Sequence, residues 1–270
     1  MSIPIRTPAE IDAIARAARV VRRALDAAVD ALRPGVTTIF VAHAASRALR
    51  DAGAESLFDR ESDDAGRTFP HAVCICVNEQ AVHGVPGDRT LESHDLVTID
   101  LGGRLDGWCA DLARSAVVGG ASDGLLDAAR VLTDLACGLC QPGACWGDVA
   151  RAVAANADKL GVYLLDGFAG HGIGRELHEQ PVARLGPLHE RAATAGGGSS
   201  QPTGCRSNHD LILRPGMVLT VEPIVCNRPV GTVLDADGWT VRTRDGSRAC
   251  YAERMVAITR AGPRILGGKA

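Results

Sequence analysis

Five side chains with metal-binding chemistry lie at or near the ends of apolar runs in this sequence. They are Asp100 in LVTIDLGG, Asp111 in GWCADLARS, His171 in GFAGHGIGRELH, Glu222 in MVLTVEPI and Glu253 in YAERMVAI. Such runs are typical of buried strands, and a buried acid must be protonated, paired or bound to a metal. Four acids that share one site would carry a charge of about −4, which two divalent cations would cancel. The pattern therefore predicts a hydrolase with two metal ions.

Asp100 and Asp111 flank a glycine-rich segment that predicts a tight turn between two strands. A hairpin centred between Leu105 and Asp106 would place Asp100 opposite Asp111. Facing Cβ atoms are about 4.5–5.5 Å apart, which suits two metal ions about 3.5–4 Å apart. Asp106 itself is expected to be an ordinary turn residue.

Three histidines are candidates for the same site. His171 and His178 bracket the segment HGIGRELH, where glycines at 170, 172 and 174 would let the backbone approach a ligand closely. One imidazole among carboxylates suits Mn, Fe, Co or Zn better than Mg or Ca. His83 lies on a loop that leaves the strand expected at 72–77, where its imidazole could donate to a substrate. Taken singly, a histidine beside glycine is more often a loop residue, so these assignments depend on the carboxylates.

The elements that must position these residues are marked by helix caps and stops. Thr7, Pro8 and Glu10 form a capping box at the start of the first helix, which Pro34-Gly35 ends. A second helix is expected from about Thr38 to Ala52. The remaining expected elements are strands at 72–77, 96–101 and 112–118, and helices at 123–140 and about 147–160.

The glycine and proline residues that end helices in the first half of the chain recur at equivalent positions in the second half. Pro34-Gly35 and Gly53 correspond to Pro142-Gly143 and Gly161, and LVTID at 96–100 resembles VLTVE at 218–222. The repeat predicts one α/β domain over residues 1–270, with halves at about 8–120 and 121–262 and the site at the seam between them. The Gly/Ser-rich segment 191–210 predicts an exposed, flexible insertion that either gates the cleft or is inert.

Composition excludes several classes of protein. The 270 residues carry a net charge of −3, with 46% hydrophobic and 23% charged residues, as in a soluble globular protein that does not recognise nucleic acid. No apolar run is long enough to span a membrane, and the N-terminus lacks the apolar core of a signal peptide. The nine cysteines are expected to be reduced, and the CxxC at Cys137 and Cys140 lacks a second pair to complete a zinc site.

Five separated segments, in order along the chain, resemble type I methionine aminopeptidases. They are VCICVNEQAVHGVPGD, LVTIDLGGRLDGWCADLARSAVVG, GHGIGRELHEQP, LRPGMVLTVEPIV and DGWTVRTRDGS. The resemblance implies the pita-bread fold, an internally duplicated α/β (α+β) structure with pseudo-two-fold symmetry. It also implies a monomeric cytoplasmic enzyme that removes the initiator methionine from nascent polypeptides whose second residue is small, with the ribosome as one place of encounter.

Position by position, the resemblance implies two divalent metal ions, Mn, Fe, Co or Zn, held by Asp100, Asp111, His171, Glu222 and Glu253. A metal-activated hydroxide would attack the first peptide carbonyl, with Glu222 as base and proton shuttle. His178 would contact the carbonyl or the developing oxyanion, and His83 the scissile nitrogen. Phe69, Cys74 and Trp239 match positions that line the methionine pocket, although ordinary core packing explains Phe69 and Cys74 equally well.

Two alternatives remain open at this point. A relative that cuts before proline, or a creatinase-like hydrolase, would share the motifs, and an inactive paralogue could use the fold as a binding module. The sequence also departs from the family pattern. Arg254 follows the last acid where His is usual, and Gly66 and Leu177 stand where aromatic residues often line the pocket.

Overall fold

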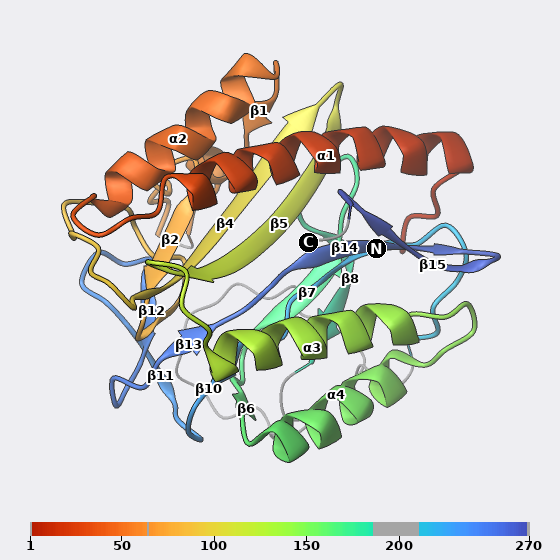
Figure 1. Ribbon diagram of the computed structural model, residues 1–270. Helices are drawn as coiled ribbons and strands as arrows, with labels where there is room; N and C mark the ends of the chain where they lie inside the picture. The colour runs from red at the N-terminus through yellow and green to blue at the C-terminus, as the bar shows by residue number, and fades with distance from the viewer. Residues whose placement is uncertain (1, 64, 186–210, 269–270) are drawn as a thin grey trace.

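Two pairs of helices lie on either side of a central set of antiparallel strands in the computed structural model of the chain (Figure 1). The structure describes residues 2–63, 65–185 and 211–268. The helices are α1 (Pro8–Asp30), α2 (Thr38–Asp51), the short 3₁₀ helix η1 (Phe58–Arg60), α3 (Gly124–Leu139) and α4 (Trp146–Leu160). The four long helices therefore lie where the sequence predicts them.

The strands form four sheets within the described residues, and every strand pair in them is antiparallel. The first sheet holds β1 (Glu55–Ser56), β2 (Cys74–Val77), β4 (Leu96–Leu105) and β5 (Trp108–Val117). The largest runs in the order β15 (Gly262–Leu266), β14 (Arg254–Thr259), β9 (Val218–Val221), β7 (Ala169–Gly172) and β8 (Glu179–Arg184). Two smaller sheets comprise β13 (Ala249–Cys250), β10 (Val225–Cys226) and β6 (Tyr163–Leu164), and β11 (Thr232–Leu234), β12 (Val241–Thr243) and β3 (Gln80–Val82).

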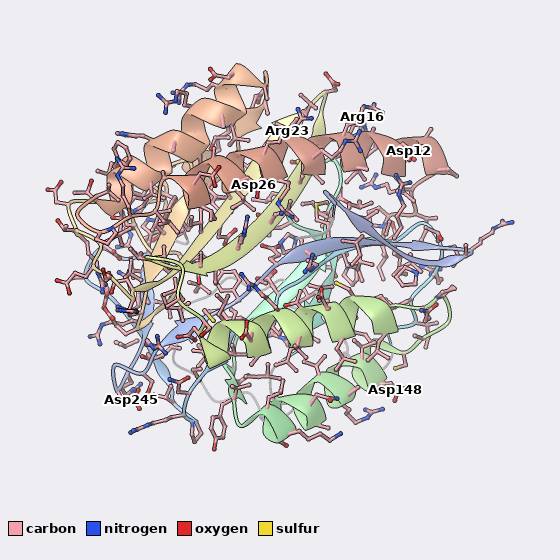
Figure 2. All side chains as sticks on the ribbon, in the orientation of Figure 1. Asp12, Arg16, Arg23, Asp26, Asp148 and Asp245 are labelled. Atoms are coloured by element: carbon pink, nitrogen blue, oxygen red, sulfur yellow. The ribbon has the colours of Figure 1, made fainter. Side chains whose placement is uncertain are left out.

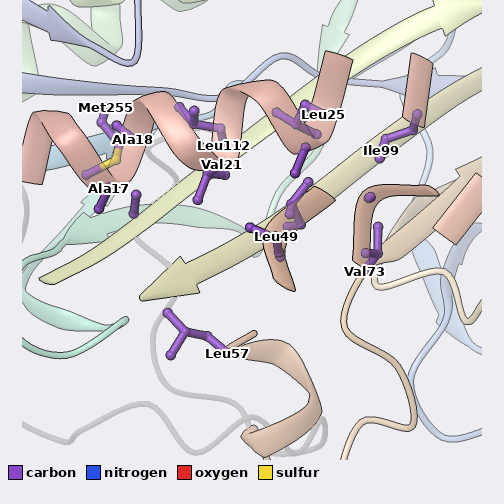
Figure 3. Close-up of a cluster of buried hydrophobic side chains, with 14 of the residues drawn as sticks. Ala17, Ala18, Val21, Leu25, Leu49, Leu57, Val73, Ile99, Leu112 and Met255 are labelled. Atoms are coloured by element: carbon purple, nitrogen blue, oxygen red, sulfur yellow. The ribbon is translucent and has the colours of Figure 1, made fainter. Parts of the chain in front are cut away.

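Helix α1 shows how the apolar pattern becomes a core. Thr7 and Glu10 make the predicted capping box, which satisfies amide groups that the first turn leaves without partners. The buried side of α1 includes Val21 and Leu25 and packs on β4 and β5 (Figure 3). Asp12, Arg16 and Arg23 lie on its exposed side (Figure 2). The first half of the chain thereby forms its own apolar cluster under α1 and α2.

The second half repeats this arrangement with α3 and α4 over the larger sheet. The repeat extends to single hydrogen bonds, since Gly35 donates its N–H to Leu91 at 2.8 Å and Gly143 donates to Leu213 at 2.8 Å. Both glycines have a φ near +87°, at 88° and 86°, which residues with a Cβ rarely adopt. The recurring glycines in the sequence thus mark equivalent turns.

None of the described helices has the length and apolar character needed to cross a membrane. The eight cysteines that the structure describes are free thiols. Cys137 is buried in α3 and Cys140 is buried just after its C-terminus, and burial raises the pKa of both, that of Cys140 to about 12. Both are therefore neutral, poorly nucleophilic thiols that pack as small apolar side chains, as the sequence predicted.

Candidate metal centre

Asp100 and Asp111 extend from the β4–β5 hairpin, whose register differs from the predicted one. Asp106 and Gly107 form a two-residue turn with φ values of 52° and 75°, and Leu105 pairs with Trp108. Asp111 therefore faces Gly102 rather than Asp100, and Asp100 faces Ala113. Because the shift is two residues, both acids still point to the same side of the sheet as diagonal neighbours.

His171 is placed by strand β7, which lies between β8 and β9. A Cβ at Gly170 would come within 2.3 Å of the Thr220 carbonyl oxygen, and one at Gly172 within 2.1 Å of that of Gln180. The glycines beside His171 thus let strands approach one another, not a ligand as the sequence suggested. At Gly174, a Cβ would meet the guanidinium of Arg6 at 2.4 Å.

The His171 ring is oriented for metal binding. Its Nδ1 lies 3.0 Å from the carbonyl oxygen of Gly172, which fixes the proton on Nδ1 and leaves the Nε2 lone pair free. Nε2 lies 3.8 Å from Oδ2 of Asp111. Ligand atoms of Asp111, His171 and Glu253 all lie within 4.8 Å of one another. One metal ion fits between atoms at these separations.

Three carboxylate oxygens of the predicted ligands are buried and have no hydrogen-bond partner. They are Oδ1 of Asp100, Oδ1 of Asp111 and Oε1 of Glu253. Leaving a buried acceptor unsatisfied costs about 1–3 kcal/mol, and more for a charged group. The partnerless oxygens of Asp111 and Glu253, beside the His171 imidazole, are explained if a cation occupies the space between them, so the residues present fit a metal centre.

The acids also raise one another's pKa values. Burial, and then repulsion from Asp100, raises the pKa of Glu222 to about 8, and burial raises that of Asp100 to about 7 despite a hydrogen bond to its carboxylate. Burial and the neighbouring acids raise the pKa values of Asp111 and Glu253 well above their usual range. Without cations, therefore, this cluster holds protons near neutral pH.

Two hydroxyl groups orient the acids, and neither was predicted. Tyr251 donates to Oδ2 of Asp100 at 2.7 Å. Thr220 donates to Oε1 of Glu222 at 3.0 Å and accepts from the backbone N–H of His171 at 2.9 Å. Thr220 lies two residues before Glu222, and Tyr251 lies two before Glu253. That spacing of two places them on the same side of extended backbone and was the available signal.

His83 and His178 both have exposed side chains. His83 follows β3, so it lies one short strand beyond the position predicted for it, and it adopts a positive φ of 54°. The next residue must be glycine, because a Cβ at Gly84 would come within 2.2 Å of the Ile75 carbonyl oxygen. Although its ring reaches solvent, the surrounding protein lowers the pKa of His83 to about 4, so its imidazole is neutral.

His178 is the closer of these two histidines to the metal cluster. Its ring centre lies 4.5 Å from that of His171, and its Nδ1 lies 3.5 Å from Oε2 of Glu61. The contact with His178 lowers the pKa of Glu61. The Glu61 carboxylate therefore contacts the His178 imidazole. Nothing in the sequence had identified Glu61 as part of the site.

The three predicted pocket residues are only partly brought together. Cys74 is buried and pairs with Asp100 across the sheet, so its side chain lies on the same side as that ligand. Phe69 is buried and packs edge-on against Trp239, with ring centres 5.3 Å apart. Leu177 is part of the first apolar cluster. The insertion predicted at 191–210 lies outside the described residues.

Comparison with known proteins gives one consistent result. Residues 12–260 match the family model "Metallopeptidase family M24". A methionine aminopeptidase of Aquifex aeolicus is 32% identical over 98% of this chain and 99% of its own length. The crystal structure of a methionine aminopeptidase from Rickettsia prowazekii covers 99% of this chain and 100% of its own, with a TM-score of 0.85 and 27% identity. A Pyrococcus furiosus prolidase, 22% identical with a TM-score of 0.71, shares the fold over 98% of this chain and 66% of its own.

Proposed function

Because this chain belongs to metallopeptidase family M24, we propose that it is a methionine aminopeptidase that releases the N-terminal methionine from polypeptides whose second residue is small. Its full-length relatives carry that name and are hydrolases. The fold is the pita-bread fold of methionine aminopeptidases and prolidases, as the sequence predicted.

The observation that supports the activity best is the convergence of two partnerless carboxylate oxygens, on Asp111 and Glu253, with the His171 imidazole. We propose that Asp100, Asp111, His171, Glu222 and Glu253 hold two divalent cations there. The mixed imidazole and carboxylate set favours Mn, Fe, Co or Zn. When bound, such cations lower the pKa of water and polarise a peptide carbonyl.

Glu222 is proposed to move the proton in this reaction. Thr220 donates to Oε1, which leaves Oε2 to accept a proton from the attacking water. The same carboxyl group can then pass that proton to the leaving amine. Thr220 also binds the backbone of His171, so one hydroxyl sets the distance between the base and a metal ligand.

The two exposed histidines are proposed to bind the substrate. His178 lies beside His171 and is held by Glu61, from where it can donate to the carbonyl oxygen as negative charge develops. His83 has a neutral ring, so one ring nitrogen can donate a hydrogen bond and the other can accept one from the scissile amide. Their access to solvent keeps the approach open to a polypeptide end.

The methionine side chain is proposed to lie against Cys74, Phe69 and Trp239. A thiol and two aromatic rings suit a flexible thioether. The natural substrates would then be the N-termini of nascent polypeptides. The proposed site of the reaction is therefore the cytoplasm, near the ribosome. Reduced thiols agree with that compartment. A monomeric state stays a prediction.

The activity is tested with the full chain loaded with Mn²⁺ or Fe²⁺ and short peptides that vary the first two residues. We expect release of methionine from Met-Ala-Ser and little from Met-Lys-Ser. Cleavage of Gly-Pro peptides in preference to Met-Ala-Ser would favour the proline-specific alternative. Tight metal binding without cleavage of any peptide would favour an inactive paralogue.

A further inference from the structure

The segment that connects β7 to β8, residues 173–178 and here called the His178 turn, ends at His178. Glu179, the first residue of β8, holds this turn through its carboxylate. Oε1 of Glu179 accepts the backbone N–H of Arg175 at 2.8 Å and that of Glu176 at 3.2 Å. His178 lies between these two amides and Glu179 in the chain, so the position of the carboxylate fixes where the imidazole is presented.

The other oxygen of this carboxylate is bound by a residue from the far end of the chain. Arg6, which precedes α1, donates from Nη2 to Oε2 of Glu179. The two side chains are only 13% and 11% exposed, so solvent screens this ion pair less than a surface pair. Without Arg6, a nearly buried carboxylate would lose its counter-ion, and Glu179 would turn toward water and release the His178 turn.

Further contacts fix Arg6 against the same part of the molecule. Its guanidinium lies on the backbone of Gly174 in the His178 turn, where a Cβ would overlap it. The guanidinium also lies 5.4 Å from the centre of the Trp108 ring, and that of Arg175 lies 3.7 Å from the same ring. The backbone N–H of Arg6 donates to the carbonyl of Gly216 at 2.7 Å, two residues before β9. Arg6 therefore has a fixed place from which to hold Glu179.

We propose that Arg6 is a positioning residue for His178. Its ion pair with Glu179 holds the His178 turn so that the imidazole stays where it can donate to the developing oxyanion. This inference rests on the proposed function, in which His178 acts on the substrate carbonyl. Because that negative charge develops only in the transition state, a displaced His178 slows the chemical step more than it weakens substrate binding.

The test replaces Arg6 in the full chain loaded with Mn²⁺. Arg6→Met keeps an apolar stem and removes the charge. Its kcat on Met-Ala-Ser should fall about 10–100-fold, the range expected when a catalytic group is slightly misplaced. KM and metal content should change little. Arg6→Lys should restore much of the kcat, because an ammonium group can also pair with Glu179.

A second readout does not depend on activity. Amide hydrogen exchange at residues 175 and 176 should become about tenfold faster in Arg6→Met, because the carboxylate that accepts both N–H groups is released. Arg264→Met, which breaks the exposed ion pair between Arg264 and Asp12, is the matched control. It should alter neither exchange at these amides nor kcat.

The double variant Arg6→Met with Glu179→Gln tests the coupling of the two residues. It removes both charges, so it folds without an unpaired buried ion even if Arg6→Met alone does not, and thermal unfolding checks this. Its kcat should be no lower than that of Arg6→Met, because the two substitutions remove one interaction. Effects on kcat that multiply would contradict the proposed pairing.

Wild-type exchange and wild-type kcat in Arg6→Met would overturn the proposal. Faster exchange with unchanged kcat would overturn it as well, because Arg6 would then have only a structural role. Loss of bound metal in Arg6→Met would assign its effect to the metal centre instead of His178. If the wild type releases no methionine, the proposed function fails, and hydrogen exchange alone decides whether Arg6 holds the His178 turn.

Discussion

The hydroxyl of Tyr251 lies 2.7 Å from Oδ2 of Asp100, and among the described residues it is the only side chain that donates a hydrogen bond to that buried carboxylate. Tyr251 is itself buried, and burial and the charge on Asp100 raise its pKa well above the usual range. It therefore stays protonated and donates to the Asp100 carboxylate. The bond fixes one oxygen of Asp100, whereas Oδ1 is buried without a hydrogen-bond partner and is the atom proposed to bind a metal ion.

Tyr251→Phe should weaken metal binding by about 10–100-fold, the usual effect of removing a group that orients a ligand. The ring is retained, so the packing around it changes little. Metal affinity is measured by titration into the chelator-treated protein. Tyr163→Phe, at an exposed tyrosine, is the matched control and should have no effect. Unchanged affinity in Tyr251→Phe would show that Asp100 is held by its strand alone.

The stability of the metal-free protein should fall as pH rises from about 6.5 to 8. Asp100 and Glu222 have folded-state pKa values raised to about 7 and 8, so their stabilisation is complete below their unfolded pKa values and is lost as pH rises through the folded ones. His171 and His83, lowered to about 3 and 4, act in the opposite sense, but only below pH about 6.5.

Bound metal should reverse this trend, because cations take the place of the protons. Melting temperatures of the chelator-treated and metal-loaded protein, measured across this interval, should therefore diverge as pH rises. A metal-free protein that becomes more stable between pH 6.5 and 8 would contradict the predicted proton uptake by the acids.

His83→Ala should leave metal content unchanged and slow cleavage of Met-Ala-Ser by about 10²–10⁴-fold, the usual contribution of a proton donor or acceptor at the reaction centre. His83 is exposed and does not contact the cluster of Asp111, His171 and Glu253. His43→Ala, on the exposed surface of α2, serves as the control. Full activity in His83→Ala would remove His83 from the mechanism.

Gly172→Ala should destabilise the protein by about 1–3 kcal/mol, since the added methyl group meets the Gln180 backbone. It should also weaken metal binding, because the Gly172 carbonyl orients His171. Gly138→Ala is the contrasting change. That glycine lies in α3 with open space around it, so alanine should stabilise the helix by up to about 1 kcal/mol. The free energies of unfolding of both variants, measured by denaturant titration, test these two expectations.

Much of this architecture follows from the sequence because each signal is local. Helix caps and stop glycines fix the ends of α1 to α4, and acids at the ends of apolar runs identify residues that the fold brings to one place. Local sequence signals did not predict the register of the β4–β5 pair. A turn can be centred on either side of Asp106, and only the positive φ of both Asp106 and Gly107 decides between them.

Other features depend on contacts between elements far apart in the chain. Tyr251, just after β13, donates to Asp100 on β4, and Glu61, just after η1, contacts His178. The spacing of residues along the chain does not predict such contacts, although Tyr251 lies two residues before Glu253, which indicated that it belongs to the same site.

The most direct test of the metal centre follows metal content and methionine release together while Mn²⁺ is titrated into chelator-treated protein. Wild type should gain activity on Met-Ala-Ser as metal binds and level off near two ions per chain, whereas Asp111→Asn should neither bind tightly nor cleave. Asp106→Asn, at the exposed turn, should match wild type. Undiminished cleavage by metal-free wild type, or by Asp111→Asn, would contradict the account.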